Sequence, residues 1–96
     1  MPKFVKSRVR FFSSTNGGRI VMPTGNGYAP YIRAASLPQD LPIRINGLPD
    51  EGNFETEYEV TLELTYTSND YSPLAEGSPF SLVEGSRVVA EGRITS

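Results

Sequence analysis

The side chains that most enzymes use for catalysis are scarce in this chain. It contains no histidine and no cysteine, which removes the commonest general base, thiol nucleophiles, thiolate metal ligands and disulfides. Serine, threonine, tyrosine, lysine and carboxylates remain, but none lies in a recognisable pattern that would activate a nucleophile. The sequence therefore predicts a protein that is not an enzyme and that needs neither a cofactor nor a metal.

The most regular ionisable pattern is an acidic ladder, made of Glu55, Glu57, Glu59 and Glu63. Side chains two residues apart share one face of a strand, so these carboxylates could hold a hard cation or form an acid/base pair. No second ligand strand or pocket motif accompanies them, and residues 50–55 do not follow the calcium-loop pattern. We interpret the ladder as a solubilising strand face.

Positive and negative charges are separated along the chain. The net charge is −2, but every acidic residue lies at or after Asp40, whereas six of the nine basic residues precede it. Strands from the two halves that pack side by side would place opposite charges across from one another, and this is the interpretation we favour. The alternative is a binder with two oppositely charged faces.

The elements that must position these side chains are strands. The 96 residues include 9 glycines and 8 prolines, which is typical of many turns between short strands. No window of ten or more residues has the apolar spacing of a helix. The strands that the alternation and the turn residues predict are 4–12, 19–22, the part of 28–34 after Pro30, 43–45, 55–66, 80–83 and 87–95.

This pattern predicts an all-β protein with one domain over residues 1–96. About six short strands without a helix favour a small closed antiparallel barrel, which leaves no sheet edge exposed. Most of the five tyrosines are expected to fill the barrel or its ends. Because no apolar run approaches the ~20 residues that cross a bilayer and no signal peptide is recognised, we expect a cytoplasmic protein without a membrane contact.

Motifs at both ends of the chain carry a family resemblance. The first are Phe4-x-x-x-x-Val9-x-Phe11-Phe12, Gly17-Gly18-Arg19, Pro23 and Gly27-Tyr28-x-Pro30, and the last runs Pro73-Leu74-Ala75-x-Gly77-x-Pro79-Phe80-Ser81-Leu82-Val83-Glu84-Gly85-Ser86-Arg87-Val88-Val89-Ala90-x-Gly92-x-Ile94. Together they resemble the third, C-terminal domain of translation elongation factor Tu, least clearly over residues 34–53. The resemblance implies a six-stranded antiparallel β-barrel.

In that family the third domain contacts the T arm of aminoacyl-tRNA, the guanine-exchange factor and the nucleotide domain. The Gly-x-x-x-x-Gly-Lys-Ser/Thr phosphate loop is missing from this chain, so neither GTP hydrolysis nor a nucleotide cofactor is expected. Several family charges are also missing. Ala29 and Tyr31 replace the Arg and Gln of the family's Gly-Tyr-Arg-Pro-Gln-Phe, and Val83 replaces the Arg of its Arg-Glu-Gly-Gly.

The resemblance implies a non-catalytic interaction module that binds a macromolecular partner of the translation machinery, or a decoy or immunity-like protein. The residues expected at a protein partner are Gly27, Tyr28, Tyr31, Glu84 and Arg87. The alternative is a tRNA- or RNA-binding accessory protein that uses basic side chains of the N-terminal half. The residues expected to contact RNA are Lys6, Arg8, Arg10 and Arg19.

Overall fold

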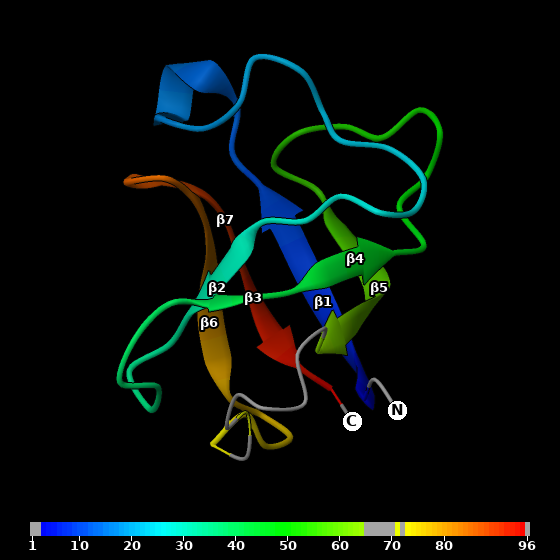
Figure 1. Cartoon of the computed structure of the whole chain (residues 1–96). Coiled ribbons are helices and arrows are strands. Elements are labelled where there is room, and N and C mark those ends of the chain that lie inside the picture. Colours follow the sequence, from blue (N-terminus) through cyan, green and yellow to red (C-terminus); the bar gives the residue numbers. More distant parts are fainter. Residues whose placement is uncertain (1–2, 65–70, 72, 96) are drawn as a thin grey trace.

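A computed structural model describes residues 3–64, 71 and 73–95 of the chain (Figure 1). Its elements are β1 (Lys3–Phe11), a short 3-10 helix η1 (Ser14–Asn16), β2 (Tyr31–Arg33), β3 (Leu41–Pro42), β4 (Arg44–Asn46), β5 (Glu57–Leu64), β6 (Pro79–Glu84) and β7 (Arg87–Ile94). These residues contain no α-helix, and none of their helical structure has the length and apolar character for a membrane span. The all-β prediction is confirmed.

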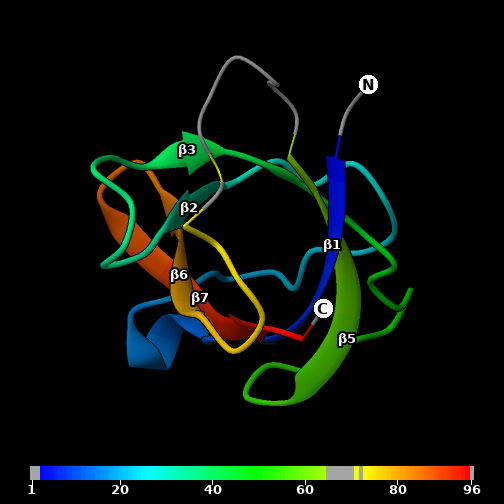
Figure 2. The ribbon, with the colours of Figure 1, turned by 90° about the horizontal axis from the view of Figure 1, so that it is seen from below.

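The strands form one antiparallel sheet that curls into a nearly closed barrel. Their order is β3-β2-β6-β7-β1-β5-β4. The two outermost strands, β3 and β4, follow each other in the chain with only Ile43 between them, and Figure 2 shows how they bring the ends of the sheet together. The described residues form seven strands instead of the six expected, because the segment that closes the barrel is split at Ile43.

The predicted strand at residues 19–22 is wrong. Arg19 makes one isolated bridge with Ser13, and the next two residues, Ile20 and Val21, are 82% and 67% exposed. The strand after Pro30 is confirmed as β2. The acidic strand begins at Glu57, two residues later than expected, and its predicted last two residues lie outside the described part of the chain.

The core follows the predicted alternation. In β1 the side chains of Ser7, Val9 and Phe11 are buried, and in β5 those of alternate residues from Val60 to Leu64 are buried. Among the tyrosines, Tyr71 belongs to the core, while Tyr28 and Tyr58 pack against it. Tyr31 is instead 48% exposed, and Tyr66 lies outside the described residues.

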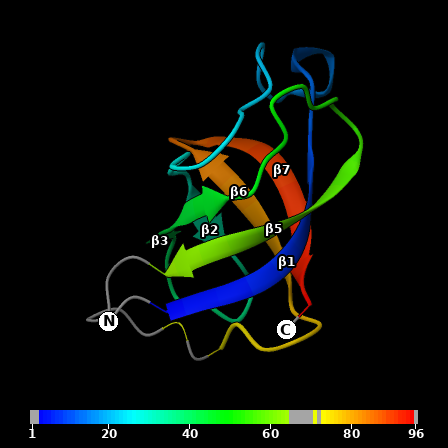
Figure 3. The ribbon, with the colours of Figure 1, turned by 90° about the vertical axis from the view of Figure 1, so that its right-hand side faces the viewer.

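Opposite charges meet between β1 and β5, which lie side by side (Figure 3). The antiparallel register places Arg8 opposite Glu59 and Arg10 opposite Glu57. Strand β4 continues this pattern on the other side of β5, where Arg44 opposes Glu63. The two pairs between β1 and β5 join the basic and the acidic halves of the sequence, which is the interpretation that the sequence analysis favoured.

Candidate interaction surface

Three of the predicted partner residues gather at one end of the barrel. There the β6–β7 turn lies beside the segment that follows β1 (Figure 1). Tyr28 and Glu84 meet at this end, and Arg87 donates a hydrogen bond from Nη1 to the Gly18 carbonyl at 3.4 Å. Arg19, which we expected to bind RNA, joins the same group because it pairs with Glu84.

The carboxylate of Glu84 is the centre of this group, which we call the Glu84 cluster (Arg19, Tyr28 and Glu84). Its Oε2 accepts hydrogen bonds from Tyr28 Oη and Arg19 Nη1. The Arg19 guanidinium lies over the Tyr28 ring, 5.0 Å from its centroid. Burial, together with the hydrogen bond to Glu84, raises the pKa of Tyr28 well above its ordinary value. The phenol therefore stays protonated and keeps donating to Glu84.

The Glu84 cluster fixes the loop of residues 12–22, which we call the apical loop. Arg19 donates from Nε to the Val21 carbonyl at 2.8 Å, and its backbone N–H donates to the Phe12 carbonyl at 3.0 Å. Gly18 lies so close to Phe12 that a Cβ at position 18 would be 1.9 Å from the Phe12 carbonyl oxygen. Only glycine permits this approach.

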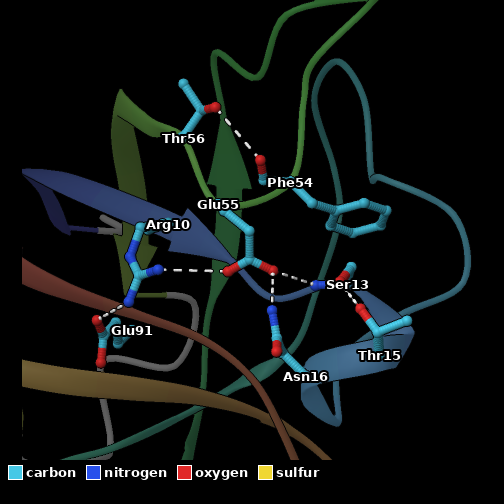
Figure 4. A network of polar contacts seen from close by, with 8 residues as sticks. All are labelled: Arg10, Ser13, Thr15, Asn16, Phe54, Glu55, Thr56 and Glu91. Atoms are coloured by element: carbon cyan, nitrogen blue, oxygen red, sulfur yellow. Dashed lines mark hydrogen bonds and ion pairs between the residues drawn. The ribbon is translucent and has the colours of Figure 1, made fainter.

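A second carboxylate, that of Glu55, holds the other side of the apical loop (Figure 4). Glu55 Oε2 accepts hydrogen bonds from the Ser13 backbone N–H at 2.8 Å and from Asn16 Nδ2 at 2.9 Å. Its Oε1 accepts one from Arg10 at 3.3 Å. Glu55 has a φ of +59°, a conformation that is unfavourable for this residue type unless its surroundings maintain it. Glu55 is therefore a loop anchor, a role that the ladder interpretation missed.

Replacing Glu55 with glutamine is expected to lower the melting temperature modestly at neutral pH. The Ser13 amide and the Asn16 side chain hold the pKa of Glu55 below its ordinary value of 4.5. A lowered folded-state pKa stabilises the protein above about pH 4.5, and this stabilisation is lost as the pH falls through the folded-state value. The difference between wild type and Glu55→Gln should therefore shrink in acid.

Thermal unfolding at several pH values measures this difference. Glu51→Gln is the matched control, because Glu51 is exposed and makes no hydrogen bond or ion pair within the described residues. A difference that is constant from neutral to acidic pH would show that the ionised carboxylate does not anchor the loop.

The apical loop presents two adjacent apolar side chains to solvent. Ile20 and Val21 are the most exposed large apolar residues in the described part of the chain. Single exposed apolar residues are ordinary, but these two are consecutive and their loop is tied down by Glu55 and by the Glu84 cluster. Sequence reasoning missed them because a run of β-branched residues also favours a strand.

Two other predicted partner residues have different surroundings. Gly27 has a φ of +93°, and its N–H donates to the Ile45 carbonyl at 3.0 Å. This hydrogen bond joins the segment around Gly27 to β4. Tyr31 faces outward from β2, where it opposes Val83 in β6. Within the described residues, Tyr31 makes no side-chain hydrogen bond, ring stacking or cation–π contact with the Glu84 cluster.

The basic residues expected to bind RNA are largely paired with carboxylates. Arg10 pairs with both Glu55 and Glu91 and lies 5.1 Å from the centroid of the Phe12 ring. Arg8 reaches Glu59 at 3.4 Å, and Arg19 pairs with Glu84. Lys6 is exposed on the outer face of β1. Nucleic-acid phosphates would have to displace the carboxylates that hold Arg10 and Arg19, which opposes binding of a long polyanion.

Neither a protein-family model nor a curated protein sequence matches this chain. The resemblance to the elongation factor domain stays a prediction from the motifs of the sequence.

Proposed function

We propose that this chain is a non-catalytic interaction module that binds a protein partner through its apical loop and the adjoining β6–β7 turn. The observation that carries this proposal is the exposure of Ile20 and Val21 on a loop anchored from two sides. A loop that is already ordered loses little conformational entropy on binding. Tyrosine and arginine, the residue types of Tyr28 and Arg19 in the adjoining Glu84 cluster, are enriched in binding hot spots.

The family resemblance supports a partner from the translation machinery. Gly18, Arg19, Tyr28, Glu84 and Arg87 match family positions, and the same residues build or adjoin the apical loop. A partner that recognises this part of the elongation factor domain would meet a similar arrangement here, with charges changed at Ala29 and Val83. Shared shape with altered charge favours a competitor or decoy that retains some of the family's partners and loses others.

RNA binding through the basic strand is less well supported than protein binding. Arg10 and Arg19 are held by carboxylate partners within 4 Å, which leaves only the exposed Arg8 and Lys6, of the four residues expected to contact RNA, for phosphates. Non-specific affinity for nucleic acids depends on cations that are free to neutralise phosphates. We therefore place the RNA-binding alternative second.

The test of the proposed function is retention of a protein from the native lysate after nuclease treatment. The double variant Ile20→Ser and Val21→Ser should reduce its retention at least about tenfold, because burying each side chain contributes about 1.5–3 kcal/mol. Phe4→Ser is the matched control. Phe4 is 53% exposed and lies at the start of β1, whereas the apical loop follows the end of this strand.

A purified elongation factor third domain should compete for the retained protein if the two share a partner. Equal retention by wild type and by the double variant would contradict the assignment of the apical loop. Retention that disappears after nuclease treatment and at high salt would instead favour the RNA-binding alternative.

A further inference from the structure

The outer face of the sheet contains a pair of like charges in direct register. Arg8 of β1 opposes Arg93 of β7. Two residues along β1, Arg10 lies between Glu57 of β5 and Glu91 of β7. Negative and positive charges therefore alternate across the strands in this neighbouring row. Like charges directly opposite each other on paired strands are destabilising. The row of Arg8 and Arg93 therefore carries a positive charge that the fold does not balance.

Arg93 is the arginine with the unbalanced charge. Its Nη1 donates to the Gly77 carbonyl at 3.1 Å, but no carboxylate lies within ion-pair distance of it among the described residues. Arg8 does have a carboxylate partner, Glu59, but the two side chains are 56% and 79% exposed. An ion pair this exposed is weak and exchanges readily with an anion from solution.

Arg8 and Arg93 line a groove of about 680 Å³ on this face. The lining also includes Arg33, which is held in place by hydrogen bonds of 2.9 Å to both carboxylate oxygens of Asp40. Ala34, Pro79 and Phe80 contribute apolar surface. Glu57 and Glu91 line the groove as well, on the side of Arg10. The groove thus has one basic part and one part where charges are balanced.

We propose that this groove binds a phosphate monoester between Arg8 and Arg93. A phosphate monoester carries a charge of about −2 near neutral pH and has three terminal oxygens, which match two guanidinium groups. A single carboxylate has only two oxygens and is satisfied by one arginine. A long polyanion would also meet Glu59 next to Arg8, and Glu57 and Glu91 in the neighbouring row. This site is separate from the apical loop and does not depend on the proposed protein partner.

The test is a titration of the full chain with methyl phosphate at constant ionic strength. Binding is monitored through the backbone and arginine side-chain NMR signals. Signals of Arg8 and Arg93 should shift and saturate, and dimethyl phosphate, which carries one negative charge, should bind much more weakly. Arg93→Gln should weaken binding about tenfold or more through loss of a charge-assisted fork. Arg93→Lys keeps the charge without the fork and should show an intermediate loss.

Arg44→Gln is the matched control, because Arg44 is an exposed strand arginine that pairs with Glu63 outside this groove. A phosphoserine peptide distinguishes the source of the phosphate. Tighter binding of the peptide than of methyl phosphate points to a phosphorylated protein as the ligand, whereas equal binding points to a small ester. Both results support the site. Shifts that chloride reproduces, that Arg93→Gln leaves unchanged, or that are exceeded by single-stranded RNA at the same residues would overturn the proposal.

Discussion

Replacing Gly92 with alanine is expected to destabilise the barrel by about 3 kcal/mol or more, at the upper end of the cost of overpacking a core. Gly92 lies in β7, opposite Val9 of β1 and Phe80 of β6. A Cβ at this position would be 2.3 Å from the Arg8 carbonyl oxygen and 2.7 Å from Cζ of Phe80. A shift of the Phe80 ring cannot relieve the clash with the Arg8 carbonyl, so the pairing of β1 with β7 must be distorted as well.

Urea denaturation measures this loss as a lower midpoint with an unchanged slope. Gly52→Ala is the matched control, because a Cβ there would meet only the Met22 and Pro49 side chains, at 3.1 Å or more. It should cost less than about 1 kcal/mol, since the long Met22 side chain adapts easily. If both variants unfold at the same urea concentration, the close packing of Arg8 and Phe80 around Gly92 is wrong.

Replacing Glu84 with alanine is expected to cost about 1–3 kcal/mol, the usual penalty for leaving a partly buried polar group without a partner. Both the Tyr28 hydroxyl and the Arg19 guanidinium donate to Glu84. Loss of these two hydrogen bonds also removes the attachment of the apical loop to the β6–β7 turn. Partner retention should therefore fall in this variant even though Ile20 and Val21 are intact.

A double-mutant cycle between Glu84→Ala and Tyr28→Phe separates the hydrogen bond from general loss of packing. A coupling free energy of about 0.5 kcal/mol or more is expected for side chains in direct contact. Glu76→Ala serves as the control, because Glu76 is exposed and forms no hydrogen bond or ion pair within the described residues. Additive effects of the two substitutions would show that Glu84 and Tyr28 do not act as a unit.

Much of the barrel could be predicted from the sequence because strand alternation is a local property. In residues 4–12 and 55–64, apolar side chains largely alternate with polar or charged ones. Every strand of a sheet that buries one face shows this period of two, whichever strands are its neighbours. The turn around Gly85 was also predictable, because a glycine lies between two segments with strand character. In the structure Gly85 has a φ of +61°, which suits glycine.

The candidate site was predictable only in part. Tyr28, Glu84 and Arg87 were expected at a protein partner and Arg19 at RNA, and both expectations stay predictions, although Glu84 brings Arg19 and Tyr28 together. Ile20 was expected in a strand, and that prediction is wrong. A run of β-branched residues satisfies the local preference for a strand, but local preference does not supply a neighbouring strand with free hydrogen-bonding groups.

The sequence by itself determined the all-β character and the alternation of buried and exposed side chains along its longest strands, but it left open whether the basic and acidic halves neutralise each other. Only the tertiary structure decided which charges meet, because register depends on how far paired strands are offset. That offset gives Arg8 both Glu59 and Arg93 as neighbours. It also brings Glu55 to Ser13 and Glu84 to Arg19, contacts between residues 42 and 65 positions apart in the chain, which no local pattern encodes.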